Sequence, residues 1–547
     1  MLAVRKLKLH INPWSILSFC FVLVIISPNI DILANMFSKP NENWDHIKTY
    51  LLKDYILNSL TIISVTGVLT MLIGTLMAWL ISAYDFPFRR FFKWALVLPL
   101  AIPPYIAAYT YNGILDYTGV VQRFLRNVLE VQVNPKSFDI MTIKGAIFIF
   151  TVFLFPYVYM ITRAFLEKQS ASLIENARML GSNSFEIFFR VVLPISRGAI
   201  LGGTTLVSLE VLNDYGVVSY FGIPTFSTAI FKTWFSMGDI QSAVKLSSIL
   251  MFMVLGIVLS EKWLRGRKKY SYATAKVRPI IRKQLKGVQA AFAFFFCFIS
   301  FSIGFLIPTL QLLHWSTLTY NKILNLRFLE LMVNSVWVAL IASILITLIS
   351  VVIANFSRIQ DNWIGKLFSR STLVGYSVPG AVIAIGVILF FVGIDNQLQR
   401  FYRLINSNSI TLVLTTSSVM LIFAYVIRFL AVGFQSIESG FEKVGKRFFE
   451  ASRMLGNGVT QTFFKVDFPM IKPALISGLA LTFVDIVKEL PLTLILRPFN
   501  FNTLATKVFE YANDEKIQEA SIPSLIIILV SFCSIFLLYK LGDKEAE

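Results

Sequence analysis

Long apolar stretches recur along the whole chain and alternate with short polar connections. As helices, stretches of about 20 such residues cross the ~30 Å hydrocarbon core of a bilayer. The pattern therefore predicts an all-α integral membrane protein with about twelve transmembrane helices, six in each half. The predicted spans are residues 14–37, 55–84, 92–113, 142–162, 197–213 and 241–263, and then 289–313, 331–356, 372–394, 409–434, 471–490 and 520–540.

One polar segment occurs twice. Glu175–Pro194 reads ENARMLGSNSFEIFFRVVLP, and Glu450–Pro469 reads EASRMLGNGVTQTFFKVDFP, 275 positions later. Outside the segment, Asn58 is matched by Asn334 at almost the same offset. The chain therefore reads as two copies of one unit. We predict a first repeat at 1–261 with its loop at 170–196, a basic linker at 262–288, and a second repeat at 289–547 with its loop at 439–470.

Composition and charge agree with a membrane protein and predict its orientation. The chain is 56% hydrophobic, its mean hydropathy is +0.69 and its net charge is +19. Basic residues gather before the first span, which we interpret as retained, and in Lys262–Lys286. Both termini and both repeated segments should therefore face the cytoplasm, with the two repeats parallel. The linker is expected to rest on anionic membrane lipid, and nucleic-acid binding is not expected.

The sequence holds no convincing catalytic or tight metal site. All three cysteines fall inside predicted spans, and the three histidines lack the H-E-x-x-H spacing. Gly440–Arg447 approaches a phosphate-binding loop, but Arg447 replaces the hydroxyl residue that would hold magnesium. We therefore expect neither an enzyme nor an ATP-binding chain, and no nucleophile and base pair supports a membrane-embedded enzyme.

The repeated segment predicts two short helices that meet at a glycine. Gly181 and Gly456 would end the first helix, and Asn183 with Glu186 would start the second helix of the first copy. The second helix would carry aromatic residues, and exposed aromatics in a cytoplasmic loop often mark a partner surface. Two nearly identical loops suggest two identical partners.

These segments resemble the EAA loop of ABC importer permeases, whose coupling helix sits in a cleft of the ATP-hydrolysing subunit. Two copies in one chain look like a fused permease dimer with the type I ABC importer fold, and only Asn176 and Ser452 depart from the pattern's preferred alanine. The resemblance implies two copies of an ATPase that binds ATP and Mg, a periplasmic solute-binding protein, and no cofactor on this chain. It implies ATPase-coupling roles for Glu175, Ala177, Gly181, Phe188, Pro194, Glu450, Ala451, Gly456, Phe463 and Pro469.

Further segments narrow the family. Glu210–Gly216 (EVLNDYG), Asp485–Pro491 (DIVKELP) and Leu496–Thr503 (LRPFNFNT) look like the fused permeases of ferric iron importers of the bacterial inner membrane. Thiamine and polyamine importers have related permeases and stay open as alternatives. A secondary transporter driven by an ion gradient, the alternative from another class, would need no ATPase, and the EAA-like loops argue against it.

Two pairs of acids lie in or near the ends of the fifth and eleventh predicted spans. Glu210 and Asp214 are four residues apart, and Asp485 and Glu489 occupy the matching positions. Charged residues in a span are costly and usually face a cavity or a partner, so the four acids could line a path for a hard cation. In the structural alternative, Lys488 pairs with one acid and Asp214 caps a helix. No tight metal site is expected, because a conduit must release what it admits.

Overall fold

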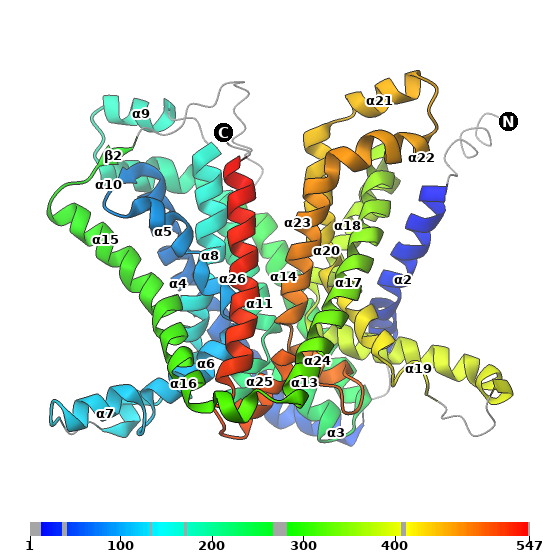
Figure 1. Cartoon of the computed structure of the whole chain (residues 1–547), viewed down its shortest axis with the longest axis horizontal. Helices are drawn as coiled ribbons and strands as arrows, with labels where there is room; N and C mark the ends of the chain where they lie inside the picture. The colour runs from blue at the N-terminus through cyan, green and yellow to red at the C-terminus, as the bar shows by residue number, and fades with distance from the viewer. Residues whose placement is uncertain are drawn as a thin grey trace. The chain divides into compact units, whose positions relative to one another are not determined.

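The computed structural model describes residues 13–35, 41–131, 134–168, 172–265, 282–360, 362–405 and 412–544. Within these ranges the regular secondary structure is helical, apart from one pair of two-residue strands (Figure 1). The predicted all-α membrane fold is therefore confirmed.

Among the described residues, nine helices are long and apolar enough to cross a membrane, or up to ten if one bent pair forms a single span. The bent pair corrects the third predicted span, because Arg89–Ala101 and Pro104–Asn127 meet at 91°. Two consecutive prolines, Pro103 and Pro104, occupy the break, where neither can donate a backbone hydrogen bond. Two shorter apolar helices, Pro13–Pro28 and Ser521–Leu537, lie where the first and twelfth spans were predicted.

Contacts divide the chain into two compact units that do not coincide with the two sequence repeats. Unit 1 contains Met1–Asp45, Ile230–Met251 and Leu324–Thr506. Unit 2 contains His46–Ala229, Phe252–Ile323 and Lys507–Glu547. Each unit thus combines segments from both halves of the sequence. The repeat boundaries near 261 and 289 stay predictions about the sequence.

Unit 1 is a helical bundle in which α2, the first helix among the described residues, packs against helices of the second half. Its elements are α2 (Pro13–Asn35), α3 (Glu42–His46), the start of α14 (Ile240–Arg265), α17 (Leu326–Ile359), α18 (Trp363–Ser377), α19 (Gly380–Ile405), α20 (Ser418–Val444), α21 (Arg447–Met454), α22 (Val459–Thr462), the π-helical turn η6 (Phe463–Asp467), α23 (Phe468–Val487) and α24 (Pro491–Leu496). The helices α17, α20 and α23 pack on one another, and α2 packs on α17, α18 and α19.

Unit 2 is built around α4, α8 and α11, which pack on one another. Its elements are η1 (Ile47–Leu51), α4 (Leu52–Ala83), β1 (Tyr84–Asp85), α5 (Arg89–Ala95), η2 (Leu98–Ala101), α6 (Pro104–Leu115), α7 (Val120–Asn127), η3 (Pro135–Phe138), α8 (Ile143–Lys168), α9 (Ser172–Met179), α10 (Ser184–Ile187), the π-helical turn η4 (Phe188–Val192), α11 (Leu193–Asn213), α12 (Gly216–Tyr220), β2 (Lys283–Gln284), α15 (Val288–Phe301), η5 (Ser302–Leu306), α16 (Ile307–Ile323) and α26 (Ser521–Lys544). Two further helices, α13 (Phe226–Phe235) and α25 (Leu504–Asn513), include residues of both units.

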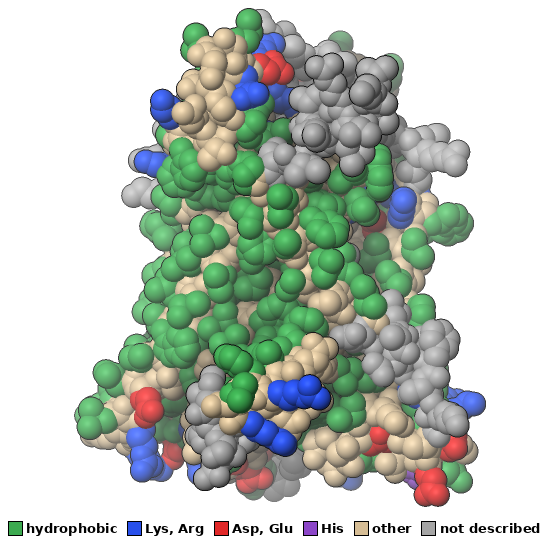
Figure 2. All heavy atoms as spheres, turned by 90° about the vertical axis from the view of Figure 1, so that its right-hand side faces the viewer, with side chains coloured by type: hydrophobic (Ala, Val, Ile, Leu, Met, Phe, Trp, Pro, Cys, Tyr) green, Lys and Arg blue, Asp and Glu red, His purple; other side chains and the backbone are tan. Residues whose placement is uncertain are grey.

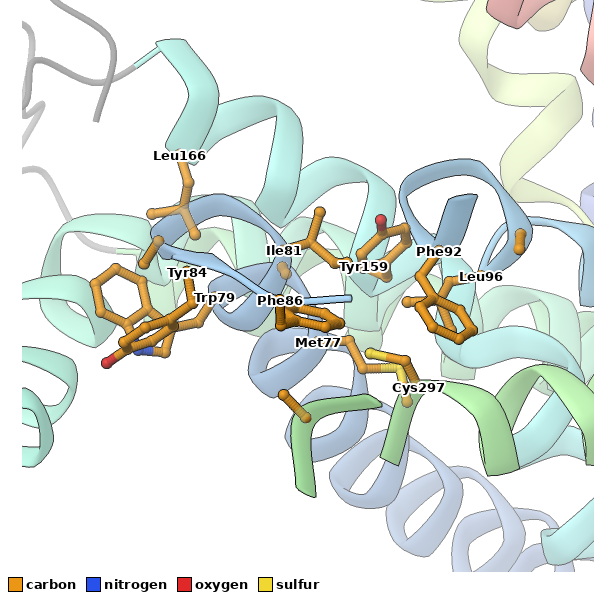
Figure 3. Packing of buried hydrophobic residues seen from close by; sticks show 14 of the residues in the cluster. Met77, Trp79, Ile81, Tyr84, Phe86, Phe92, Leu96, Tyr159, Leu166 and Cys297 are labelled. Atoms are coloured by element: carbon orange, nitrogen blue, oxygen red, sulfur yellow. The ribbon is translucent and has the colours of Figure 1, made fainter. Parts of the chain in front are cut away.

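A buried cluster in unit 2 joins the end of α4 to α5, α8 and α15 (Figure 3). Trp79, Phe92, Tyr159 and Cys297 belong to it, and the strands β1 and β2 pair in parallel beside it. This cluster fixes the end of unit 2 that carries α9 and α10 in Figure 1, because Ile187 and Val192 of the loop pack into it.

A broad band of hydrophobic side chains covers the middle of the face shown in Figure 2, and charged side chains gather toward its two ends. Exposed apolar residues such as Val336, Leu340 and Leu348 run along α17. An apolar band of this kind is what a lipid-facing surface requires.

A polar cluster in unit 1 ties α3 to the start of α14. The Asp239 carboxylate accepts hydrogen bonds from Asn41 Nδ2 (2.8 Å), Asn43 Nδ2 (3.2 Å) and the Ser242 backbone N–H (3.1 Å). Burial alone would raise the pKa of Asp239, but the hydrogen bonds from Ser242, Asn41 and Asn43 outweigh burial and hold that pKa below its ordinary value. The cluster therefore caps α14 with a charged carboxylate.

Candidate functional site

Both repeated segments form two short helices joined by a glycine, as predicted. In unit 2, α9 ends before Gly181, and α10 and η4 lead into α11. In unit 1, α21 ends before Gly456, and α22 and η6 lead into α23. We call these two segments the first and second coupling loops, residues 172–193 and 447–468.

Each glycine ends its helix in the left-handed conformation, with φ of 84° at Gly181 and 88° at Gly456. In the first loop, Ser182 N–H donates to the Ala177 carbonyl (3.1 Å) and Gly181 N–H to the Arg178 carbonyl (3.0 Å). The same two bonds close around Gly456 in the second loop. These bonds form a Schellman motif, which satisfies the last carbonyls of a helix and favours glycine at this position.

The end of each first helix exposes two apolar residues. Met179 and Leu180 are each 86% exposed, and their counterparts Met454 and Leu455 are 89% and 83% exposed. Leaving four large apolar side chains in water is unfavourable, by roughly 1.5–3 kcal/mol for each side chain that a partner would bury fully. The two tips are therefore matched candidate docking surfaces.

The second short helix starts differently in the two loops. In the first, Asn183 Oδ1 accepts from Glu186 N–H (2.9 Å) and Glu186 Oε2 accepts from Asn183 N–H (3.1 Å), a capping box at the helix start predicted for these two residues. In the second, Gly458 N–H donates to Gln461 Oε1 (3.1 Å). Both arrangements satisfy backbone N–H groups at the start of the second short helix.

The residues assigned to coupling from sequence separate into exposed and packed groups. Gly181, Pro194, Glu450, Ala451, Gly456 and Pro469 are exposed, whereas Glu175, Ala177 and Phe188 are half-buried and Phe463 is buried. The exposed group can meet a partner directly, and the aromatic pair attaches each loop to its own bundle. Their coupling roles stay predictions.

A buried ion pair holds the second coupling loop, and sequence reasoning missed it. The Arg358 guanidinium of α17 donates two hydrogen bonds to the Asp467 carboxylate, at 3.0 and 2.5 Å, and Asp467 is fully buried. The guanidinium also lies 4.3 Å from the Phe441 ring centre and 5.1 Å from that of Phe449. The only signal in the sequence was a charged residue where the first repeat has Val192.

Helix α2 also contacts the second coupling loop. The Trp14 ring centre lies 4.8 Å from that of Phe463, and Trp14 Nε1 donates to Thr460 Oγ1 (3.3 Å). The first loop is attached by apolar contacts instead, with Phe188 6.2 Å from Trp79 between ring centres. The two loops thus share a backbone fold but differ in how they are attached.

The four candidate path acids lie at or near two equivalent helix breaks: Asp214 and Glu489 lie in the breaks, and Glu210 and Asp485 lie in the last turn of the preceding helices. Asp214, between α11 and α12, accepts from Val217 N–H at Oδ1 (2.8 Å). Glu489, between α23 and α24, accepts from Leu492 N–H at Oε1 (3.1 Å). Both carboxylates therefore cap the short helix that follows, as the structural alternative held for Asp214.

Asp485 forms the ion pair considered from sequence. Its Oδ1 lies 2.8 Å from Lys488 Nζ, and both side chains are about one quarter exposed. Glu210 is half-buried near the end of α11. The structure thus accounts for three of the acids by local contacts, and lining of a path stays a prediction.

Comparison with known proteins agrees with both repeats. A family model described as "Binding-protein-dependent transport system inner membrane component" matches residues 70–261 and again residues 346–546. These two matches contain both coupling loops and all four acids.

Several relatives match most of the chain. The Fe(3+)-transport system permease protein FbpB 2 of Haemophilus influenzae is 26% identical over 86% of this chain and 87% of its own length. The ferric transport system permease protein FbpB of Actinobacillus pleuropneumoniae is 22% identical over 82% of this chain and 65% of its own. The molybdenum transport system permease protein ModB of Escherichia coli is 25% identical over 38% of this chain and 91% of its own.

The expected resemblance to fused ABC importer permeases is confirmed by these matches. The chain therefore belongs to the family of inner-membrane components of binding-protein-dependent transport systems, the permeases of ABC importers, and carries the family's domain twice.

Proposed function

We propose that this chain is the translocating subunit of an ATP-driven ferric iron importer. The observation that supports iron as the substrate is the share of the chain that relatives match. Relatives named as ferric permeases match 82–86% of the chain. A relative named as a spermidine/putrescine permease matches 37% and the molybdenum permease 38%. A polyamine or thiamine substrate is the alternative within the same architecture.

Each coupling loop is proposed to dock into one subunit of a homodimeric ATPase. Support comes from the matching Schellman turns and the matching exposed tips, Met179-Leu180 and Met454-Leu455. Two surfaces of the same shape fit two copies of one partner. ATP and Mg would be bound and hydrolysed by those partners, and this chain would bind no cofactor.

Both coupling loops and both termini are proposed to face the cytoplasm. Support comes from the bias of basic residues toward the loops and the linker. A periplasmic binding protein of the ferric type would then deliver its ligand at the opposite face. ATP-driven closure of the ATPase pair would draw the coupling loops together and rearrange the helices they are attached to.

The four acids are proposed to attract the cation along its path. A carboxylate that caps a helix keeps lone pairs for another ligand, so the capping bonds of Asp214 and Glu489 are compatible with brief contact with a hard cation. The pair Asp485 and Lys488 would lower the local negative charge and keep such contact weak.

The proposal is tested by assembling the complex from its purified parts. Native mass spectrometry should find one copy of this chain with two copies of the ATPase. The ATPase activity should rise with a binding protein loaded with ferric ion and not with one loaded with a polyamine or thiamine. A complex with one ATPase subunit would contradict the two-loop assignment, and stimulation by another loaded binding protein alone would contradict the iron assignment.

A further inference from the structure

A second short motif occurs in both halves of the chain. Gln122–Arg126 reads QRFLR, and Gln399–Arg403 reads QRFYR, 277 positions later. The first copy lies in α7 and the second in the last turns of α19. In Figure 1, α7 lies at the end of unit 2 opposite α9, and α19 lies at the end of unit 1 opposite α21. Neither copy takes part in the coupling loops or the helix breaks.

The helix α7 has an exposed side that carries apolar and basic residues and an inward side that is polar. Val120 and Phe124 are exposed on one side, and Arg123 is exposed beside them. The buried Gln122 points inward, and its Nε2 donates to the Leu115 carbonyl at the end of α6 (2.8 Å). The exposed surface of α7 therefore combines two apolar side chains with one arginine.

A second contact fixes the rotation of α7 about its axis. The Arg126 guanidinium lies 3.9 Å from the centre of the Tyr117 ring, and its Nη2 donates to the Tyr117 carbonyl (2.7 Å). Because the inward side is held by Gln122 and Arg126, Phe124 cannot turn toward the bundle.

The end of α19 repeats this arrangement with other anchors. Phe401 is 57% exposed and Leu404 is 85% exposed, and Arg400 is exposed beside them. On the inward side, Tyr402 Oη donates to Asp395 (2.9 Å). The fully buried Asp395 also accepts three hydrogen bonds from the backbone N–H of Leu414 (3.1 Å) and from the backbone N–H and hydroxyl of Thr415 (2.9 and 2.7 Å).

The covering of these faces must be permanent, because their large apolar side chains are exposed and held in place. A binding protein that comes and goes would leave them in water between cycles. Lipid is always present at the neighbouring surface: α6, which leads into α7, packs its Gly113 against Trp315 of α16, and α16 exposes Leu310 and Leu313. With 8 residues, α7 is only about 12 Å long and cannot span a bilayer.

We propose that α7 and the end of α19 are interfacial helices that lie in the lipid head-group region of the leaflet opposite the coupling loops. Phe124 and Phe401 enter the acyl boundary, and Arg123 and Arg400 bind anionic phospholipid head groups. An apolar face beside arginines is the pattern of such helices, and α7 is in addition too short to span. This inference goes beyond the proposed transport function and does not depend on the substrate.

Spin-label accessibility tests the depth of these helices in the full chain. In a background with Cys20→Ser, Cys297→Ala and Cys533→Ser, labels are placed by Phe124→Cys and Phe401→Cys. The reference variants are Leu310→Cys for lipid and Phe185→Cys for water. The protein is reconstituted in vesicles of phosphatidylethanolamine and phosphatidylglycerol, and relaxation by oxygen is compared with relaxation by a water-soluble nickel chelate.

The labels at positions 124 and 401 should show an oxygen-to-nickel ratio close to that at position 310. A ratio equal to that at position 185 would overturn the proposal. Shielding that appears only after the loaded binding protein is added would also overturn it, because the surface would then be a protein-docking site. Val120→Cys and Leu404→Cys provide a second pair if a phenylalanine variant folds poorly.

The charge requirement is measured through the lipids that remain bound to the purified chain. Arg123→Gln and Arg400→Gln should each lower the preference for phosphatidylglycerol over phosphatidylethanolamine at these helices by about fivefold, as expected for one basic residue near an anionic surface. Arg123→Lys and Arg400→Lys should keep it. An unchanged preference in the glutamine variants would overturn head-group binding by these arginines.

Discussion

At the residue scale, the left-handed glycines of the coupling loops have the sharpest mutational test. Gly181→Asp and Gly456→Asp should fold and insert, because nothing lies within 4 Å of an added Cβ at either site. Each change forces a side chain into a conformation that costs about 1–2 kcal/mol and displaces the exposed tip. Uptake and co-purification of the ATPase should therefore fall at unchanged yield.

Gly458→Asp is the matched control for Gly456→Asp. Gly458 lies in the same loop, but its φ is −66°, and an aspartate is favoured at such a helix start. This variant adds the same charge without backbone strain and should retain more coupling. Equal loss in both variants would contradict the role of the turn, and full uptake in Gly456→Asp would contradict it as well.

The path acids are tested by Glu210→Gln combined with Asp485→Asn. If the acids attract a passing cation, uptake should fall while ATPase stimulation by the loaded binding protein remains, because the coupling loops are unchanged. If they are structural, yield should fall instead, since Lys488 loses the carboxylate 2.8 Å away. Adding Lys488→Met removes the cation that Asp485→Asn leaves without this carboxylate and should then recover yield. Normal uptake at normal yield would exclude an essential electrostatic path.

Single residues also show what could be read from the sequence. The turn at Gly181 was predictable, because the left-handed helix end has a known residue preference. A capping role was considered for Asp214 and not for Glu489. Hydropathy does not reveal the helix breaks at which both carboxylates accept a backbone N–H. Arg358 lies 109 positions from Asp467, and no local pattern joins residues so far apart.

At the element scale, the two coupling loops differ in attachment, and this gives a test of stability. Asp467→Asn or Arg358→Met alone breaks a buried bidentate pair, which should lower the free energy of unfolding by about 3–5 kcal/mol. The double change Arg358→Met with Asp467→Val removes both charges and brings the site closer to the apolar Val192 of the first loop. It should recover most of the stability.

Thermal unfolding of the purified chain in detergent measures these differences, with ATPase co-purification as a second readout. Val192→Ile in the first loop is a conservative control that introduces no charge. A double variant as unstable as the single variants would show that the pair itself, rather than an unpaired buried charge, is needed to hold the second loop.

Helices were predicted well where a long apolar run determines the span, and poorly where the chain changes direction within an apolar run. The span 331–356 was found within α17, because a long continuous apolar run has one solution in a membrane. The predicted span 92–113 is broken at Pro103, although its residues remain apolar on both sides. The π-helical turns before Leu193 and Phe468 leave no mark in the hydrophobic pattern.

At the scale of the whole molecule, the proposed orientation predicts which loops an impermeant thiol reagent reaches. In a cysteine-free background and intact spheroplasts, Asn134→Cys and Val413→Cys should react, and Lys283→Cys should not, because the linker belongs to the cytoplasmic side. Lys283→Cys should become reactive once the membrane is opened. Labelling of Lys283→Cys from outside would reverse the orientation.

The duplication was visible in the sequence, whereas the composition of the compact units was not. The repeat rests on identities at a fixed offset, such as Met179 with Met454. Helix α2 belongs to unit 1 because it packs on helices of that unit. The sequence does not reveal this packing, because a membrane helix is apolar on several sides and could pack through any of them. Tertiary contacts therefore decided what local sequence left open.

The central claim is that this chain imports ferric iron with energy from an ATPase held at its two coupling loops. Its most direct test is iron accumulation in vesicles that contain the chain and its ATPase, with ferric-loaded binding protein outside and no ion gradient. The account predicts accumulation that requires ATP on the coupling-loop side and that is lost in a variant combining Gly181→Asp and Gly456→Asp. Accumulation without ATP when an ion gradient is imposed would contradict it, as would ATP-driven uptake of a polyamine or thiamine but no iron.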